Sequence, residues 1–205
     1  WVLCAPSAAD LIPTIRSRVR VVRLRVPSVA EVAELLVRRD GVEPTLAERA
    51  AREAQTHIGM ALRLATDAEA RERRARTLQL ALGVQSVSGC VLAAEQLVAI
   101  ATEDAKALTA ERDEEERQAA LRSLGLEPGA TVPPALRASL KALEDDQKRR
   151  ATRSVRDGID RVLVDLMSLY RDLLMLQLGS GLELVNEAIR GELELASRAG
   201  SAEQS

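Results

Sequence analysis

The chain has 205 residues, a formal net charge of −2, and 46% hydrophobic but only 1% aromatic residues. This hydrophobic content excludes a disordered chain, and the near-neutral charge excludes a global positive field that attracts nucleic acid. No apolar run is long enough to cross a membrane and no signal peptide is visible, so we expect a cytoplasmic protein without membrane contacts.

The fold is predicted to be mainly α, because a core of leucine, valine, isoleucine and alanine suits packed helices. The first 27 residues are the exception and are predicted to be the end of a larger α/β core, with one or two strands. Residues 1–4 have the pattern of a buried strand, and residues 8–12 that of a helical turn that stops at Pro13. Residues 19–26 alternate apolar side chains with arginine, which predicts a strand with one solvent-exposed face. Since a lone strand cannot satisfy its backbone, this piece is expected to need a sheet that the chain lacks.

Residues 28–76 are predicted to form a small module of three helices. Residues 28–31, Ser-Val-Ala-Glu, have the pattern of a capping box that starts the first helix. Gly41 is expected to end that helix in the left-handed conformation, and Pro44 to open the second. The third helix is expected to begin near Gly59 and to continue through a charged stretch to Arg76.

Residues 77–199 are predicted to form a larger helical bundle, followed by a flexible tail over 200–205. Apolar residues recur at steps of three or four along this region, close to the helical period. The expected parts are a helical stretch over 78–109 that is interrupted or bent near Gly83 and Gly89, a second stretch over 110–124, a loop over 125–134, the longest helix over 135–178, and a final helix over 182–196.

The chain offers little for catalysis of its own. Neither a phosphate-cradling glycine loop nor a dinucleotide-binding fingerprint is present. His57 is the only histidine, so a histidine-based triad or zinc site has almost no ligands, and His57 is expected to cap or border a helix. Cys4 and Cys90 lie in apolar sequence and are predicted to be reduced, buried thiols. No metal and no cofactor are expected.

Charged clusters are expected to be solvated or to form salt bridges between subunits. One basic cluster lies over residues 71–76 and another over 148–156. Either could touch a phosphate backbone, but acids flank both and no aromatic platform accompanies them. The carboxylates over 113–116 and 144–146 are interpreted as helical surface.

Residues 11–18, Leu-Ile-Pro-Thr-Ile-Arg-Ser-Arg, followed by a strand pattern and a capped three-helix module, resemble the second half of an ATPase module of the clamp-loader AAA+ family. The family has Cys where this chain has Val19. Residues 58–65 resemble its lid helix, which carries a second nucleotide sensor. ATP-hydrolysing members have arginine at the position of Leu62, whereas the arginine here, Arg63, lies one step later.

The loss of nucleotide sensors narrows the resemblance to delta-prime-type subunits of the bacterial DNA polymerase III clamp loader. Residues 5–7, Ala-Pro-Ser, stand where the first sensor threonine is expected. Residues 147–174 resemble the collar helix of actinobacterial members of this type. The resemblance therefore covers the carboxy-terminal half of such a subunit: the end of the AAA+ core (1–27), a three-helix lid (28–76) and a collar that joins subunits (77–199).

The resemblance implies a subunit without a catalytic site of its own inside the DNA polymerase III holoenzyme, where it helps to load the sliding clamp during DNA replication. Arg18 is the expected arginine finger, acting in trans on ATP held by a neighbouring gamma or tau subunit. Thr14 and Ser17 are expected to shape the turn that aims it, and Leu62 marks the degenerate sensor. The implied partners are gamma or tau and delta, with the clamp and primer-template DNA reached through the complex.

Two other interpretations stay open at this point. The chain could be a fragment of an ATP-hydrolysing gamma/tau-type subunit, although Leu62 argues against that. It could also be a stand-alone helical adaptor without ATPase relatives. In that case its first 26 residues are expected to be dispensable.

Overall fold

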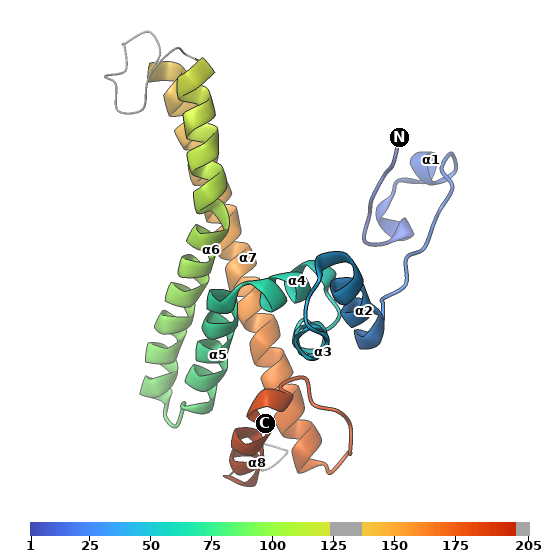
Figure 1. The fold of residues 1–205 in the computed structure, drawn as a ribbon, viewed down its shortest axis with the longest axis vertical. Coiled ribbons are helices and arrows are strands. Elements are labelled where there is room, and N and C mark those ends of the chain that lie inside the picture. The colour runs from blue at the N-terminus through green and yellow to red at the C-terminus, as the bar shows by residue number, and fades with distance from the viewer. Residues whose placement is uncertain (124–136, 200–205) are drawn as a thin grey trace.

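The computed structural model describes residues 1–123 and 137–199, and this part of the chain is mainly helical, as predicted (Figure 1). The predicted loop over 125–134 and the tail over 200–205 lie outside the described residues. The elements are η1 (Ala8–Asp10), α1 (Pro13–Arg16), α2 (Val29–Asp40), α3 (Pro44–Glu53), α4 (Ile58–Thr66), α5 (Ala68–Leu82), α6 (Val87–Ser123), α7 (Arg137–Gln177), η3 (Glu187–Ile189) and α8 (Arg190–Ala199).

Helices α2, α3 and α4 form a three-helix module with a core of its own. The predicted capping box is confirmed, because Ser28 Oγ accepts the Glu31 N–H and the Glu31 carboxylate accepts the Ser28 N–H. Gly41 ends α2 at φ +67°, and Pro44 is the first residue of α3. The buried core residues are Val32, Leu36, Val42, Ala47, Ala50, Ala51, Ala61, Leu64 and Ala65.

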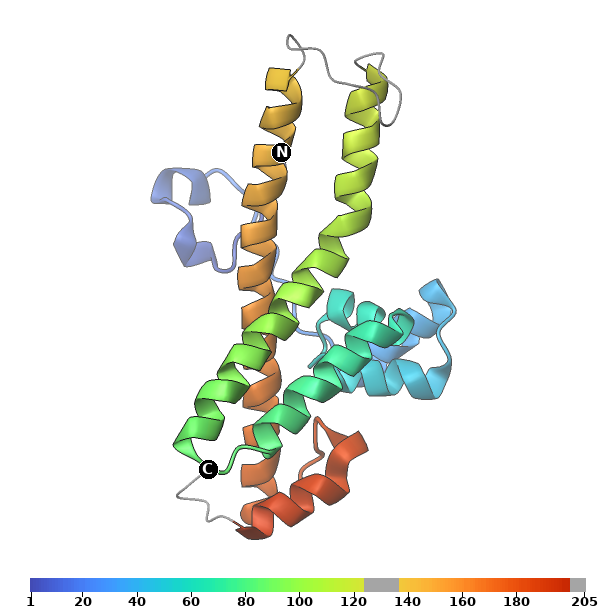
Figure 2. The same ribbon diagram turned by 90° about the vertical axis from the view of Figure 1, so that its left-hand side faces the viewer.

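Helices α5 to α8 form a long-helix bundle, in which α5, α7 and α8 pack around a second core and α6 packs along α5 and α7. The buried residues of this core are Leu78, Leu169, Leu173, Leu184 and Leu193. Helices α6 and α7 run antiparallel along most of their length and extend well beyond α5 (Figure 2). They approach closely where Gly158 meets Ala101, since a Cβ on Gly158 would lie 2.7 Å from the Ala101 carbonyl oxygen. Absence of a side chain at Gly158 therefore permits this crossing.

The two predicted strands are wrong: residues 1–4 and 19–26 adopt no strand, and none forms elsewhere in the described chain. A strand needs a neighbour, and residues 19–27 make no backbone hydrogen bond to any described segment. The helical turn predicted over residues 8–12 forms as η1 over Ala8–Asp10, and Pro13, rather than only ending that turn, begins α1. Proline fits there because the first helical N–H has no intrahelical partner.

Several predicted helices have different bounds. The stretches predicted over 78–109 and 110–124 are instead divided between α5, which ends at Leu82, and α6, which runs unbroken from Val87 to Ser123. The helix expected from Gly59 to Arg76 divides at Asp67, whose carboxylate accepts the Ala70 N–H and starts α5, so the predicted boundary at 76/77 falls inside a helix. The final helix begins at Arg190 instead of residue 182. Residues 182–186 stay non-helical because the carboxylate of Asp172 binds the N–H groups of the last two residues of that segment.

Candidate functional site

The predicted arginine finger, Arg18, lies on an exposed turn at the end of α1. Ser17 Oγ donates a hydrogen bond to the Thr14 carbonyl at 3.2 Å, and the Arg18 N–H donates to the Ile15 carbonyl at 2.9 Å. The Arg18 side chain is exposed and has no ion pair within the described chain. Thr14 and Ser17 thus belong to one turn, and Arg18 is left available to a partner.

The surroundings of Arg18 are strongly basic. Between Leu11 and Ala30 the chain carries five arginines and no acidic residue. Arg25 is paired, through a bidentate contact to Glu31, and hydrogen bonds from Arg25 and then from Ser28 lower the pKa of Glu31 to about 2. The remaining cations on this segment make the region attractive to a phosphate-bearing ligand.

The predicted degenerate sensor, Leu62, is half-buried and packs against the core of the three-helix module. The next residue, Arg63, turns toward the long-helix bundle and donates to both oxygens of Asp104 on α6, with Nη1 2.8 Å from Oδ2. Arg63 is therefore paired inside the protein. Leu62 carries no charge, so this position offers no free cation to a nucleotide.

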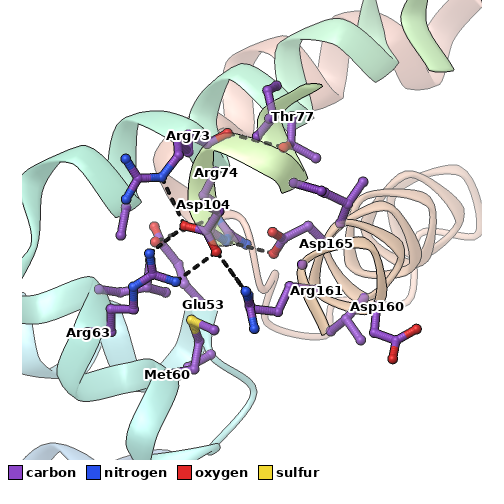
Figure 3. Close-up of a pocket in the computed structure, with 18 of the residues that line it drawn as sticks. Glu53, Met60, Arg63, Arg73, Arg74, Thr77, Asp104, Asp160, Arg161 and Asp165 are labelled. Atoms are coloured by element: carbon purple, nitrogen blue, oxygen red, sulfur yellow. Dashed lines mark hydrogen bonds and ion pairs between the residues drawn. The ribbon is translucent and has the colours of Figure 1, made fainter. Parts of the chain in front are cut away.

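Asp104 is the centre of a buried cluster that sequence reasoning missed (Figure 3). Besides Arg63 of α4, it binds Arg73 of α5, with Nε 2.9 Å from Oδ1, and Arg161 of α7, with Nη2 2.8 Å from Oδ2. Burial alone raises the pKa of Asp104, but the hydrogen bonds and charges of Arg63 and Arg161 hold it below its ordinary value. The carboxylate thus stays ionised and ties four helices together.

A second buried cluster surrounds Arg74 of α5. Its Nε donates to Asp165 at 2.9 Å, its Nη2 to the Asn186 side-chain oxygen at 2.5 Å, and its Nη1 lies 3.5 Å from a carboxylate oxygen of Glu53. Burial raises the pKa of Asp165 to about 6, against the opposing charge of Arg74. Two carboxylates therefore share one guanidinium in a poorly solvated place.

A cavity of about 290 Å³ lies beside both clusters, between the three-helix module and the long-helix bundle. Its apolar walls include Met60, Leu64, Ile100 and Val162. The arginines that border it are already paired, and the described residues contain no group of His, Cys, Asp or Glu that could hold a metal ion. The cavity is also lined by His57 and by the carboxylates of Glu53, Asp160 and Asp165.

Three isolated side chains were also singled out in the sequence. His57 caps α4, as predicted, since its Nδ1 accepts the Met60 N–H at 3.1 Å. The prediction of buried thiols is wrong, because Cys4 and Cys90 are both exposed. Cys4 belongs to the uncovered first segment, and Cys90 lies in the first turn of α6 on a face that no helix covers.

The basic cluster over residues 71–76 is not a solvated face, contrary to expectation. Arg71 Nη1 binds the carbonyls of Leu64 and Ala65 at the end of α4. Arg73 and Arg74 are buried in the two clusters described above. In the second cluster, over 148–156, Arg150 binds Asp113 and Glu116 of α6, and Arg149 binds Asp146.

One sequence signal points to Asp104. Ile100, Ala101, Asp104 and Ala105 are spaced so that they share one face of a helix, and a carboxylate within an apolar face requires a buried cation. All four are buried in the structure. The sequence does not reveal which arginines supply the charge, because they come from three other helices.

Comparisons with protein-family models, with curated proteins and with solved structures find no match to this chain. Within the described ranges, no helix combines the length and apolar character needed to span a bilayer.

Proposed function

We propose that the chain is the carboxy-terminal half of a delta-prime-type subunit of the bacterial DNA polymerase III clamp loader. In this role the subunit does not hydrolyse ATP itself. It places Arg18 against ATP bound by a neighbouring gamma or tau subunit and serves as a cytoplasmic scaffold for loading the sliding clamp onto primed DNA.

The observation that carries the proposal is the contrast between two arginines. Arg18, in the family-like Thr-Ile-Arg-Ser-Arg segment, is exposed and unpaired within the described chain. Arg63, the arginine that follows the sensor position in the sequence, is committed to Asp104. An unpaired Arg18 together with a paired Arg63 suits a subunit that assists ATP hydrolysis at a neighbouring subunit and does not hydrolyse ATP itself.

An arginine is chemically suited to this task. Its planar guanidinium can donate two parallel hydrogen bonds to phosphate oxygens and always carries its charge. In other phosphoryl-transfer systems such a finger increases the rate by about 10³–10⁵ through stabilisation of charge on the transferred group. The hydrogen bond from Ser17 Oγ to the Thr14 carbonyl fixes the turn from which Arg18 projects.

The test is an Arg18→Ala substitution in the complete subunit, reconstituted into a clamp loader. We expect clamp- and DNA-stimulated ATP hydrolysis at the neighbouring site to fall by about 10³-fold or more, while assembly is retained. Arg18→Lys should restore little, because an ammonium lacks the planar fork. Measurement is by steady-state ATPase assay.

Arg20→Ala is the matched control, since it removes an exposed arginine from the same segment. It should leave hydrolysis close to the wild-type rate. Unchanged hydrolysis with Arg18→Ala, or an equal loss with Arg20→Ala, would remove Arg18 from the role of a finger.

A helical adaptor is the second candidate, and one observation favours it. Residues 1–26 contribute nothing to either buried core, so the helices from α2 onward are organised without them. If the adaptor function is correct, removal of this segment leaves partner binding intact. In the clamp-loader proposal the same removal abolishes the effect on hydrolysis.

A further inference from the structure

We infer that the Arg63–Asp104 ion pair is the lock of a hinge at Asp67, about which the three-helix module swings relative to the long-helix bundle. This inference rests on the described geometry and does not depend on the proposed function. It concerns the junction in Figure 3, where side chains from both bodies meet around the cavity.

The two bodies have separate interiors. The buried core of the module comes from residues 32–65, and that of the bundle from residues 78–193, with no residue in common. Only Asp67 separates α4 from α5, and its backbone is extended, with φ −107° and ψ 107°. A single non-helical residue between two packed bodies is the usual position of a hinge.

The junction is crossed by ion pairs and, next to Asp67, by hydrogen bonds from Arg71 of α5 to the Leu64 and Ala65 carbonyls of α4. Three ion pairs join the two bodies. Arg63–Asp104 and Arg74–Glu53, at 3.5 Å, lie beside the cavity, and Arg52–Glu183, at 4.0 Å, lies away from it. In the first pair the side chains are only 15% and 12% exposed, whereas Glu183 is 88% exposed. Arg74–Glu53 is buried as well, at 8% and 6% exposed, but its Nη1 and Oε2 atoms are 3.5 Å apart. Arg63–Asp104 is the bidentate one of the two buried pairs, and the exposed pair contributes much less.

The lock is asymmetric, which lets it open without collapse of the bundle. Arg73 and Arg161 hold Asp104 from the bundle side, so its charge stays compensated when Arg63 leaves. Arg63 also lies near the hinge itself, since its Nε is 3.7 Å from Oδ2 of Asp67, an oxygen that Arg73 Nη2 approaches at 3.4 Å. The inferred junction therefore has two states. In the closed state Arg63 pairs with Asp104, and in the open state it pairs with Asp67 alone.

The titratable groups around the lock keep it closed near neutral pH. Asp104 faces Arg63 on α4, Arg73 on α5 and Arg161 on α7, and its pKa is held below the ordinary value. Opening therefore requires competition for Arg63 rather than a proton at neutral pH.

The test measures distances across the hinge in the full chain. Native Cys90 provides one exposed label site on α6, Arg38→Cys on exposed α2 provides the other, and Cys4→Ser removes the remaining thiol. Pulsed electron spin resonance gives the distance distribution. We expect one narrow distribution with Arg63 intact, and an additional, shifted population in Arg63→Gln.

Glu103→Gln is the matched control. Glu103 precedes Asp104 and pairs with Arg76 at 3.1 Å between α5 and α6, so its loss removes a charge without touching the module. The control should keep the single narrow distribution. An unchanged distribution in Arg63→Gln, or equal broadening in both variants, overturns the inference. Loss of helical circular dichroism in Arg63→Gln also overturns it, because the pair would then hold the fold and not a hinge.

Discussion

Arg74 is shared by two buried carboxylates, and this sharing has a cost at neutral pH. Glu53 and Asp165 both lie against its guanidinium, and neither can obtain full hydration. Asp165 responds with a pKa raised by burial to about 6. The folded state therefore binds a proton at Asp165 more readily than the unfolded state, in which the carboxyl has its ordinary, lower pKa.

Asp165→Asn is expected to stabilise the protein at pH 7.5 by roughly 1–3 kcal/mol, since it removes the cost of ionising the buried carboxyl. The raised pKa of Asp165 adds to the free energy of unfolding of the wild-type protein. This added stability is fully present at about pH 4 and is lost as the pH rises to about 6. The difference in free energy of unfolding between Asp165→Asn and the wild type should therefore grow between pH 4 and pH 6 and stay constant at higher pH. Urea unfolding at pH 4, 6 and 7.5 measures it.

Asp157→Asn is the control on the same helix, because Asp157 is exposed. It should show no such growth of the difference with pH. A wild-type protein that equals or exceeds Asp165→Asn in stability at pH 7.5 would contradict the assignment of a raised pKa.

Among the elements, the crossing of α6 and α7 depends on Gly158. Alanine is normally the better helix former by about 1 kcal/mol. Here its Cβ would meet a backbone oxygen at 2.7 Å, and backbone yields only by shifting a whole helix. We therefore expect Gly158→Ala to destabilise the protein by about 1–3 kcal/mol in urea unfolding.

Gly191→Ala on α8 is the comparison, because nothing lies within 4 Å of the added Cβ. It should be neutral or stabilising by up to about 1 kcal/mol. A gain of stability in both variants would show that the α6–α7 contact relaxes easily.

The sequence patterns correctly predicted those helix starts and ends that depend only on residues nearby in the sequence. The Ser28 capping box and the left-handed Gly41 are examples, because their hydrogen bonds stay within one turn. The break at Asp67 and the non-helical segment over 182–186 were missed. The latter is held by Asp172, thirteen or more residues earlier in the chain, and no local pattern reports such a contact.

The strands were predicted wrongly and the buried clusters were missed for the same reason, which is that both depend on residues distant in the sequence. Residues 19–26 have a strand pattern, but pattern cannot supply a neighbouring strand. Asp104 could be suspected from its apolar helix face. Its three arginine partners, however, lie 31 to 57 residues away in the sequence and come together only in the folded chain. The exposed position of Arg18 agrees with expectation, while its role as a finger stays a prediction.

At the scale of the whole molecule, residues 1–26 are expected to be dispensable for folding. They add no buried residue to either core, and Arg25–Glu31 is an exposed pair. A chain that begins at Pro27 should keep its helical circular dichroism and its urea midpoint. A substantial drop in that midpoint would show that the segment packs against the helices in solution.

The division into two interiors also determines how the chain loses its structure. A domain with one continuous interior melts as a unit, whereas two bodies joined through a few charges need not melt together. Once the contacts of Asp104 and Glu53 across the junction are lost, the smaller body can unfold while the longer helices persist. A single melting temperature is then an average over two events, and calorimetric and van't Hoff enthalpies cease to agree.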